Sequence, residues 1–175
     1  MAGVLKSYGN AEVKPDCVYI LVVASTDMCV KLSKALHIAS RNQGVNLQVH
    51  ICNKIQDLLD SDLHSQINFV VFGIDARNLN CLNKVKDNIK QLENFLKFGR
   101  MCFVNGYNVK PAEMAVTYNS IWELSIAYNV HLIKGNVEVE SKCLYLADRI
   151  LRLAALTVGV KTGIPFIECP FRGTP

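Results

Sequence analysis

Apolar residues are spaced along the chain in two alternating ways. Continuous apolar runs, typical of strands buried on both faces of a sheet, recur at intervals. They predict strands at 17–23, 47–52, 67–74, 101–104 and 130–133. Between these runs, apolar residues recur at helical spacing. That spacing predicts helices from Met28 to about Gly44, over 79–98, around Ile121 and over 138–158, with a short helix or packed loop at 55–63.

Five strands that alternate with helices predict an α/β fold. Right-handed crossovers then give a three-layer arrangement, a mostly parallel sheet with helices on both faces. We divide the chain into an N-terminal extension at 1–16, a domain at 17–158 and an apolar C-terminal tail at 159–175. Ligands of such folds bind beyond the carboxyl ends of the strands, so the loops there are the first candidates for a site.

Composition fits one intracellular globular domain without a membrane span. Half of the 175 residues are hydrophobic and 19% are charged, which suits a full-sized core. No apolar run reaches the ~18 residues of a span, and the N-terminus has no signal-like apolar stretch. Seven cysteines without a CxxC pair are predicted to be reduced core residues. A net charge of +4 permits an acidic partner without requiring one.

The loop after the first strand, in the stretch VVASTDMCVKL at 22–32, lies where many α/β proteins hold a phosphate. A P-loop requires GxxxxGK[ST], because glycines let the backbone curl around phosphates, lysine supplies charge and the hydroxyl binds magnesium. Here Ala24 and Cys29 occupy the glycine positions. Val30 replaces the lysine and Lys31 replaces the hydroxyl residue. None of the required residues is present.

Shifting the frame by one residue does not restore the motif. Lys31 then falls on the lysine position, but Ser25 and Val30 fall on the glycines and Leu32 on the hydroxyl. Asp27 adds a negative charge at the helix N-terminus, where a phosphate would sit. We interpret Asp27 as a helix cap.

From 17 to 158 the order of elements is similar to that of a Ras-like small GTPase domain with shortened early strands and switches. The loop NGYN lies where that fold reads guanine with NKxD. Asn105 and Asn108 match this motif only in part, and Gly106 replaces its lysine. No DxxG motif occurs between 44 and 66, which is too short for both switch segments.

A closer resemblance is carried by YILVVASTD, NLQVH, INFVVFGIDARNLNCLNKVKDNIKQLENFLKFGRMCFVNG, LSIAYNVHLI and NVEVESKCLYLADRILRLAALTVGVKTGIPF, in this order. In these segments the chain resembles the centromere protein M family. The resemblance implies a pseudo-GTPase that binds no nucleotide or other cofactor. It implies a structural subunit of the inner kinetochore, in the nucleus at centromeres, that supports kinetochore assembly and chromosome segregation. One departure is Ala24, where the family member compared has glycine.

The same resemblance implies partners and contact residues. CENP-I is the direct partner, stabilised within a complex with CENP-H and CENP-K, and DNA contact is indirect or weak. Phe98 lies ~160° from the centre of the 82–96 apolar stripe, so it points outward unless the last helical turn unwinds. The tail must pack on its own domain or on a partner. The resemblance places Phe98 and Ile167 in contact with CENP-I. The predicted partner-binding residues are Phe98, Ile164, Phe166, Ile167 and Phe171.

Two other functions stay open at this point: a weakly active or nucleotide-binding small GTPase, and a nucleic-acid-binding module. The balance of 19 basic and 15 acidic residues argues against the second. Lys86, Lys90 and Lys97 share a helical face, which fits a solvated surface better than a phosphate-binding one. The histidines are scattered without the spacing of metal ligands. Trp122 and Tyr128 are predicted to be core residues.

Overall fold

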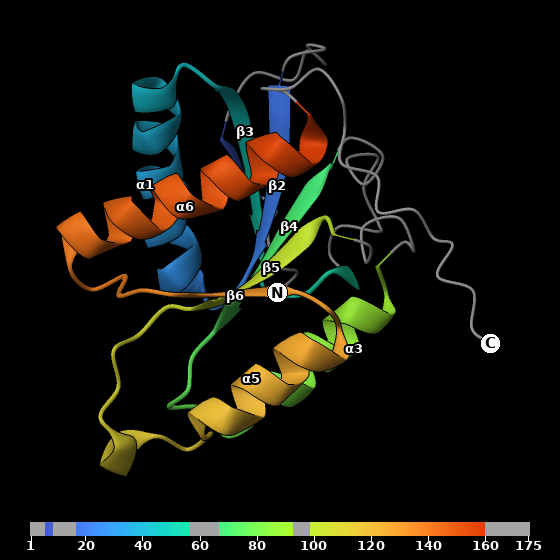
Figure 1. Cartoon of the computed structure of the whole chain (residues 1–175), viewed down its shortest axis with the longest axis vertical. Helices are drawn as coiled ribbons and strands as arrows, with labels where there is room; N and C mark the ends of the chain where they lie inside the picture. Colours follow the sequence, from blue (N-terminus) through green and yellow to red (C-terminus); the bar gives the residue numbers. More distant parts are fainter. Residues whose placement is uncertain (1–5, 9–16, 57–66, 93–98, 160–175) are drawn as a thin grey trace.

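The computed structural model describes residues 6–8, 17–56, 67–92 and 99–159, and their strands form one six-stranded sheet (Figure 1). The strand order is β1-β3-β2-β4-β5-β6. The strands are β1 Lys6–Tyr8, β2 Cys17–Val23, β3 Asn46–Cys52, β4 Phe69–Ile74, β5 Met101–Asn105 and β6 His131–Lys134. All neighbouring pairs are parallel except β1, which runs antiparallel to β3. The predicted α/β fold with a mostly parallel sheet is confirmed.

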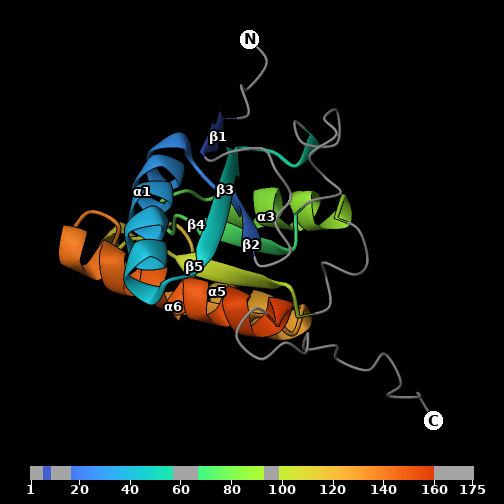
Figure 2. The ribbon, with the colours of Figure 1, turned by 90° about the horizontal axis from the view of Figure 1, so that it is seen from above.

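Helices cover both faces of this sheet (Figures 1 and 2). The described helices are α1 Thr26–Gln43, α3 Cys81–Lys90, α5 Tyr118–Ala127 and α6 Glu140–Val158, with a 3-10 turn η2 at Pro111–Glu113. Residues of β2 alternate between two buried clusters, because successive side chains of a strand point to opposite faces. Ile20 and Val22 pack with α1 and α6, whereas Leu21 and Val23 pack with α3 and α5.

The first helix begins differently from the prediction. Its N-cap is Ser25, whose side chain makes no capping hydrogen bond, and Asp27 lies inside the first turn. The interpretation of Asp27 as a cap is therefore wrong. The predicted end is confirmed, because Gly44 adopts a left-handed conformation with φ 64° and its N–H donates to the carbonyl of Arg41.

Two further differences concern the ends of elements. The N-terminal extension contains β1, in which Lys6 and Ser7 are registered with Ile51 and His50 of β3. The helix predicted over 79–98 begins at Cys81 and is regular to Lys90, and residues 93–98 lie outside the described part. Most of the element predicted at 55–63 also lies outside it.

Several composition-based predictions hold where the structure describes the residues. Six cysteines are reduced, five of them buried, while Cys169 lies outside the described residues. The ring of Tyr128 lies edge-on to that of Phe103, with centroids 6.4 Å apart. The prediction for Trp122 is wrong, because its exposure is 50%. No helix within 6–8, 17–56, 67–92 or 99–159 has the length and apolar character needed to span a membrane.

Candidate functional site

The loop between β2 and α1 lies at the point in the sheet where a ligand site is expected. The helix that follows β2 packs on one face, and the helix that follows its neighbour β4 packs on the other. Such a reversal opens a crevice beyond the carboxyl ends of the two strands, which is where open α/β sheets bind ligands. The loop between β2 and α1 therefore lies at the location predicted for a phosphate site.

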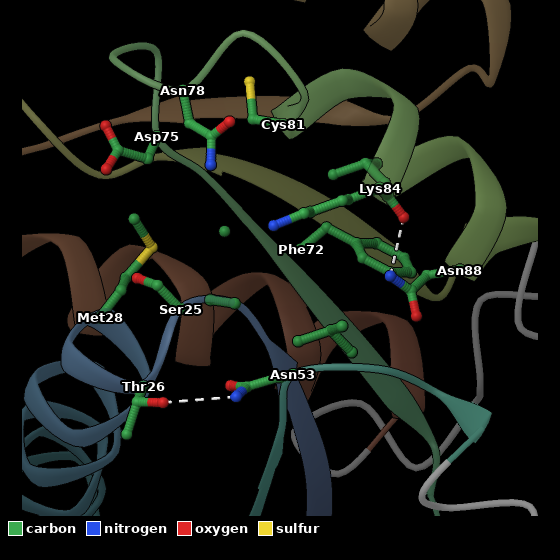
Figure 3. A pocket seen from close by; sticks show the side chains of 14 residues that line it. Ser25, Thr26, Met28, Asn53, Phe72, Asp75, Asn78, Cys81, Lys84 and Asn88 are labelled. Carbon is green, nitrogen blue, oxygen red and sulfur yellow. Dashed lines mark hydrogen bonds between the residues drawn. The ribbon is translucent and has the colours of Figure 1, made fainter. Parts of the chain in front are cut away.

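A cavity of about 290 Å3 lies in this crevice (Figure 3). Its walls come from the ends of β2 and β4, the first turn of α1 and the α3 helix. Polar lining residues are Ser25, Thr26, Asn53, Asp75, Asn78, Lys84 and Asn88. Asn53 donates to the Thr26 hydroxyl at 3.3 Å, and Asn88 donates to the Lys84 carbonyl at 2.7 Å. Several of its polar groups thus already bond one another.

The residues at the phosphate-loop positions do not face this cavity with binding groups. Ala24 contributes only a methyl group. The Cys29 thiol is buried and lies 3.5 Å from the Ala24 carbonyl and 3.6 Å from the Val22 carbonyl. Burial raises the pKa of Cys29 to about 11, so this thiol is protonated at neutral pH. Val30, at the lysine position, is half-buried and apolar.

Lys31 is the one cation at these positions, and its charge is used elsewhere. Its Nζ lies 2.8 Å from the carboxylate of Asp27 and 3.0 Å from that of Glu138. These hydrogen bonds, with Asp27 first, raise the pKa of Lys31, and the bond from Lys31 lowers the pKa of Asp27. Lys31 does not line the cavity.

Met28 fills the space beside the phosphate-loop positions. Its side chain is 1% exposed and lies over Gly73 at the end of β4 and Gly106 after β5. A Cβ on Gly73 would overlap the Met28 sulfur and lie 2.5 Å from the Ala24 methyl, and a Cβ on Gly106 would lie 2.7 Å from Met28 Cε. Here the two glycines make room for a thioether.

Charged groups around the crevice pair with one another. Arg77 binds Asp75 through two hydrogen bonds of 2.8 and 2.9 Å, and its guanidinium stacks 3.9 Å from the centre of the Tyr107 ring. The Tyr107 hydroxyl donates to Asp27 at 3.2 Å. The carboxylate of Asp75, the one acidic side chain among the residues that line this cavity, is thus already paired with an arginine. No group of three or more metal-binding side chains occurs among the described residues.

The guanine-loop positions form a second, smaller cavity of about 240 Å3. Asn105 ends β5, and its Oδ1 is buried without a hydrogen-bond partner in the described chain. Gly106 is buried and Asn108 is exposed. None of the lining residues is acidic, so the carboxylate that reads guanine in NKxD has no counterpart here. The Lys134 ammonium stacks 3.6 Å from the centre of the Tyr118 ring on the wall of this cavity.

A comparison with known families decides what kind of α/β protein this is. The model of the family described as Centromere protein M (CENP-M) matches residues 2–168. The chain belongs to the centromere protein M family. No curated protein matches it. Membership makes it a centromere and kinetochore protein of the nucleus, from a family of structural kinetochore subunits.

The structure does not describe the residues of this CENP-M family chain that are predicted to contact a partner. Phe98, Ile164, Phe166, Ile167 and Phe171 all lie outside the described residues. The described part of the stripe that places Phe98 agrees with the prediction, since Val85, Ile89 and Leu92 are buried. Lys90 on the same helix pairs with Asp87 at 3.1 Å, with both side chains mostly exposed, as a solvated face requires.

The sequence-based predictions did not include one exposed apolar surface of this CENP-M family chain, on α5. Trp122 and Ile126 of α5 are 50% and 62% exposed, whereas Ile121, Leu124 and Ser125 are buried. The signal was available, because large apolar residues at i and i+4 continue the apolar face of α5 beyond the stripe that the sheet covers.

Proposed function

We propose that this chain is a non-enzymatic structural subunit of the inner kinetochore, a pseudo-GTPase without nucleotide. Within a complex that also contains CENP-H and CENP-K, it binds and stabilises CENP-I. Through that complex it supports kinetochore assembly and chromosome segregation. The finer parts of this proposal, namely the partners and the loss of nucleotide binding, go beyond family membership.

The observation that carries the proposal is the state of the crevice beyond β2 and β4. A phosphate site there needs backbone N–H groups and a free cation turned toward an open space. Met28 occupies the space between the strand ends with an apolar side chain. Lys31 is bound by two carboxylates, and Asp27 places negative charge in the first turn of α1.

The cavity beside Met28 has few charged groups that could bind a nucleoside triphosphate. Its charged lining residues are Asp75 and Lys84, and Asp75 is already paired with Arg77. One lysine does not offset the charge of a triphosphate. The pairing of Asp75 with Arg77 leaves no unpaired carboxylate in the cavity lining to bind magnesium. Phosphoryl transfer also needs switch and magnesium elements that have no counterpart in the sequence between 44 and 66.

The test of the nucleotide part is direct. Purified protein is denatured, and the supernatant is analysed chromatographically for guanine and adenine nucleotides. Native protein is then titrated with a fluorescent GTP analogue in the presence of magnesium. We expect neither bound nucleotide nor binding in the titration. Micromolar affinity would overturn the pseudo-GTPase assignment and favour a small GTPase.

The partner part has its own test. Tagged full-length chain and a chain ending at residue 158 are used to capture purified CENP-I and the CENP-H/CENP-K pair. We expect direct capture of CENP-I by the full-length chain, and recovery of CENP-H and CENP-K only when CENP-I is present. Retention of duplex DNA at physiological salt without any partner would instead favour a nucleic-acid-binding module.

A further inference from the structure

The amino-terminal edge of the sheet carries a groove, lined by both apolar and uncharged polar residues, that the proposed function does not use. Its cavity of about 450 Å3 lies between the end of α5, the start of β6 and the last turns of α6. Trp122 and Ile126 form its α5 wall, Val130 and Leu132 lie along β6, and Thr157 belongs to α6. Its volume is in the range of sites that enclose small molecules, so it can take one or two large side chains.

The groove has no acidic or basic side chain apart from one histidine. Among its lining residues His131 is the only titratable one, and none is Asp, Glu, Lys or Arg. Half of the indole of Trp122 and most of Ile126 are nevertheless exposed. Exposed large apolar side chains beside a hollow are typical of a surface covered by another segment or molecule. An uncharged occupant with large apolar side chains fits Trp122 and Ile126.

A segment with this composition begins at the rim of the groove. The α6 helix ends at Val158, and Gly159 adopts a left-handed conformation with φ 83°, which ends the helix one residue before Val160. Thr157, in the groove wall, is only three residues before Val160. An extended chain covers at most about 3.6 Å per residue, so Ile164 lies within about 18 Å of Gly159.

The sequence of this segment matches the groove. Between Lys161 and Glu168 the chain reads TGIPFI, six residues without charge and with three large apolar side chains. Pro165 disfavours a regular helix there. We propose that residues 162–167 of this same chain bind in the groove lined by Trp122, Ile126 and Leu132. In the free chain this places Ile164, Phe166 and Ile167 against their own domain, so contact of these residues with CENP-I requires the segment to leave the groove.

The chain contains a single tryptophan, Trp122, so fluorescence excited at wavelengths that tyrosine does not absorb reports on the groove alone. The full-length protein is compared with a chain ending at residue 161, by emission spectrum and by acrylamide quenching. If residues 162–167 cover the indole, truncation shifts the emission to longer wavelength and raises the quenching constant. Far-UV circular dichroism confirms that the truncated chain is folded.

Point variants of the full-length chain keep the test valid if truncation disturbs folding. Ile164→Ser combined with Phe166→Ser should reproduce the red shift and the higher quenching constant. Tyr145→Ser is the matched control, because Tyr145 is 65% exposed on α6 and does not line the groove. It should leave the spectrum unchanged.

Three results would overturn the proposal. An indole equally accessible in the full-length and truncated chains would show that the segment does not cover it. A blue shift that grows with protein concentration in both chains would identify a second copy as the occupant. A spectrum that changes only when purified CENP-I is added, with or without residues 162–167, would assign the groove to that partner.

Discussion

The thioether of Met28 lies so close to the Cα of Gly73 that a Cβ at position 73 would overlap its sulfur. This contact joins the first turn of α1 to the end of β4. It narrows the space between two strand ends that form the ligand crevice of such folds.

The first prediction concerns this contact. Gly73→Ala should destabilise the protein by about 1–3 kcal/mol, the usual cost of overpacking a filled interior. Met28→Ala should cost about 2–5 kcal/mol by leaving a void. In the double variant the added methyl enters that void, so the total loss should be smaller than the sum. Urea denaturation measures all three, and strictly additive losses would show that the two residues do not share one space.

A second prediction concerns repair of the phosphate loop. The variant with Ala24→Gly, Cys29→Gly, Val30→Lys and Lys31→Ser should not hydrolyse GTP. Met28 still fills the space beside the loop, and the magnesium and switch elements remain absent. Phosphate release is measured against the unaltered chain, with circular dichroism to confirm folding. Turnover above that of the unaltered chain would mean that residues 44–66 supply the missing elements.

The third prediction is a pH dependence that arises from His50. This β3 residue is 0% exposed and neither ring nitrogen has a hydrogen-bond partner in the described chain. Burial lowers its pKa, so the unfolded chain binds the proton more readily. The contribution of neutral His50 is fully present above the unfolded pKa of about 6.5 and is lost as the pH falls toward the lowered folded value.

The measurement compares urea unfolding at pH 7.5 and pH 5.5. His50→Leu should reduce the loss of unfolding free energy on acidification, with an upper limit of about 1.4 kcal/mol per pH unit for one proton. Gln48→Leu is the control, because Gln48 is also buried on β3 and its side chain does not titrate. An unchanged slope in the His50 variant would locate the acid sensitivity elsewhere.

The fourth prediction concerns the partner surface. Phe98→Ala and Ile167→Glu should each weaken binding to CENP-I by about 30-fold or more, or ~2 kcal/mol, as buried interface anchors typically do. Both should melt like the unaltered chain. A core phenylalanine would instead cost about 3–5 kcal/mol of stability. Calorimetric titration and melting temperature are therefore measured on the same samples.

Leu79→Ala provides the control for this surface. Leu79 is 71% exposed and lies near the carboxyl edge of the sheet, beside the first turn of α3. It should affect neither binding nor melting. If Leu79→Ala alone weakens CENP-I binding, the partner sits over the carboxyl edge. A collapse of the melting temperature in Phe98→Ala would place that side chain in the core.

The sheet was predictable because its central strands are buried on both faces. Each of the runs CVYILVV and FVVFGI is apolar over almost its whole length, so no competing pattern obscured it. The end of α1 was predictable because glycine, here Gly44, adopts the left-handed conformation that ends a helix without the strain other residues incur. In β1, by contrast, KSY has neither the length nor the apolar character of a strand. It is a strand because β3 offers it a free edge.

The location of the candidate site and the absence of P-loop residues could be predicted from the sequence, but the side-chain packing in the site could not. The sequence places Ala24, Cys29 and Val30 at the phosphate positions. It does not reveal that Met28 reaches Gly73 and Gly106, because that contact joins the first turn of α1 to the ends of β4 and β5, which are distant in the chain. The role of Asp27 was misassigned because α1 begins at Thr26, two residues earlier than a cap at Asp27 requires, and Asp27 pairs instead with Lys31 and Tyr107. Trp122 was wrongly predicted to be a core residue because the spacing of apolar residues shows which face of a helix packs on the sheet, but not how much of that face the sheet covers.

The antiparallel pairing of Lys6–Tyr8 with β3 has a practical consequence for handling the protein. Without β1, the seven-residue strand NLQVHIC would present its backbone N–H and C=O groups along an open edge. Such edges recruit strands from other molecules and lead to aggregation. Preparations that remove the first eight residues should therefore lose solubility before they lose folded structure, so an affinity tag is better followed by a cleavage site that leaves Lys6 in place.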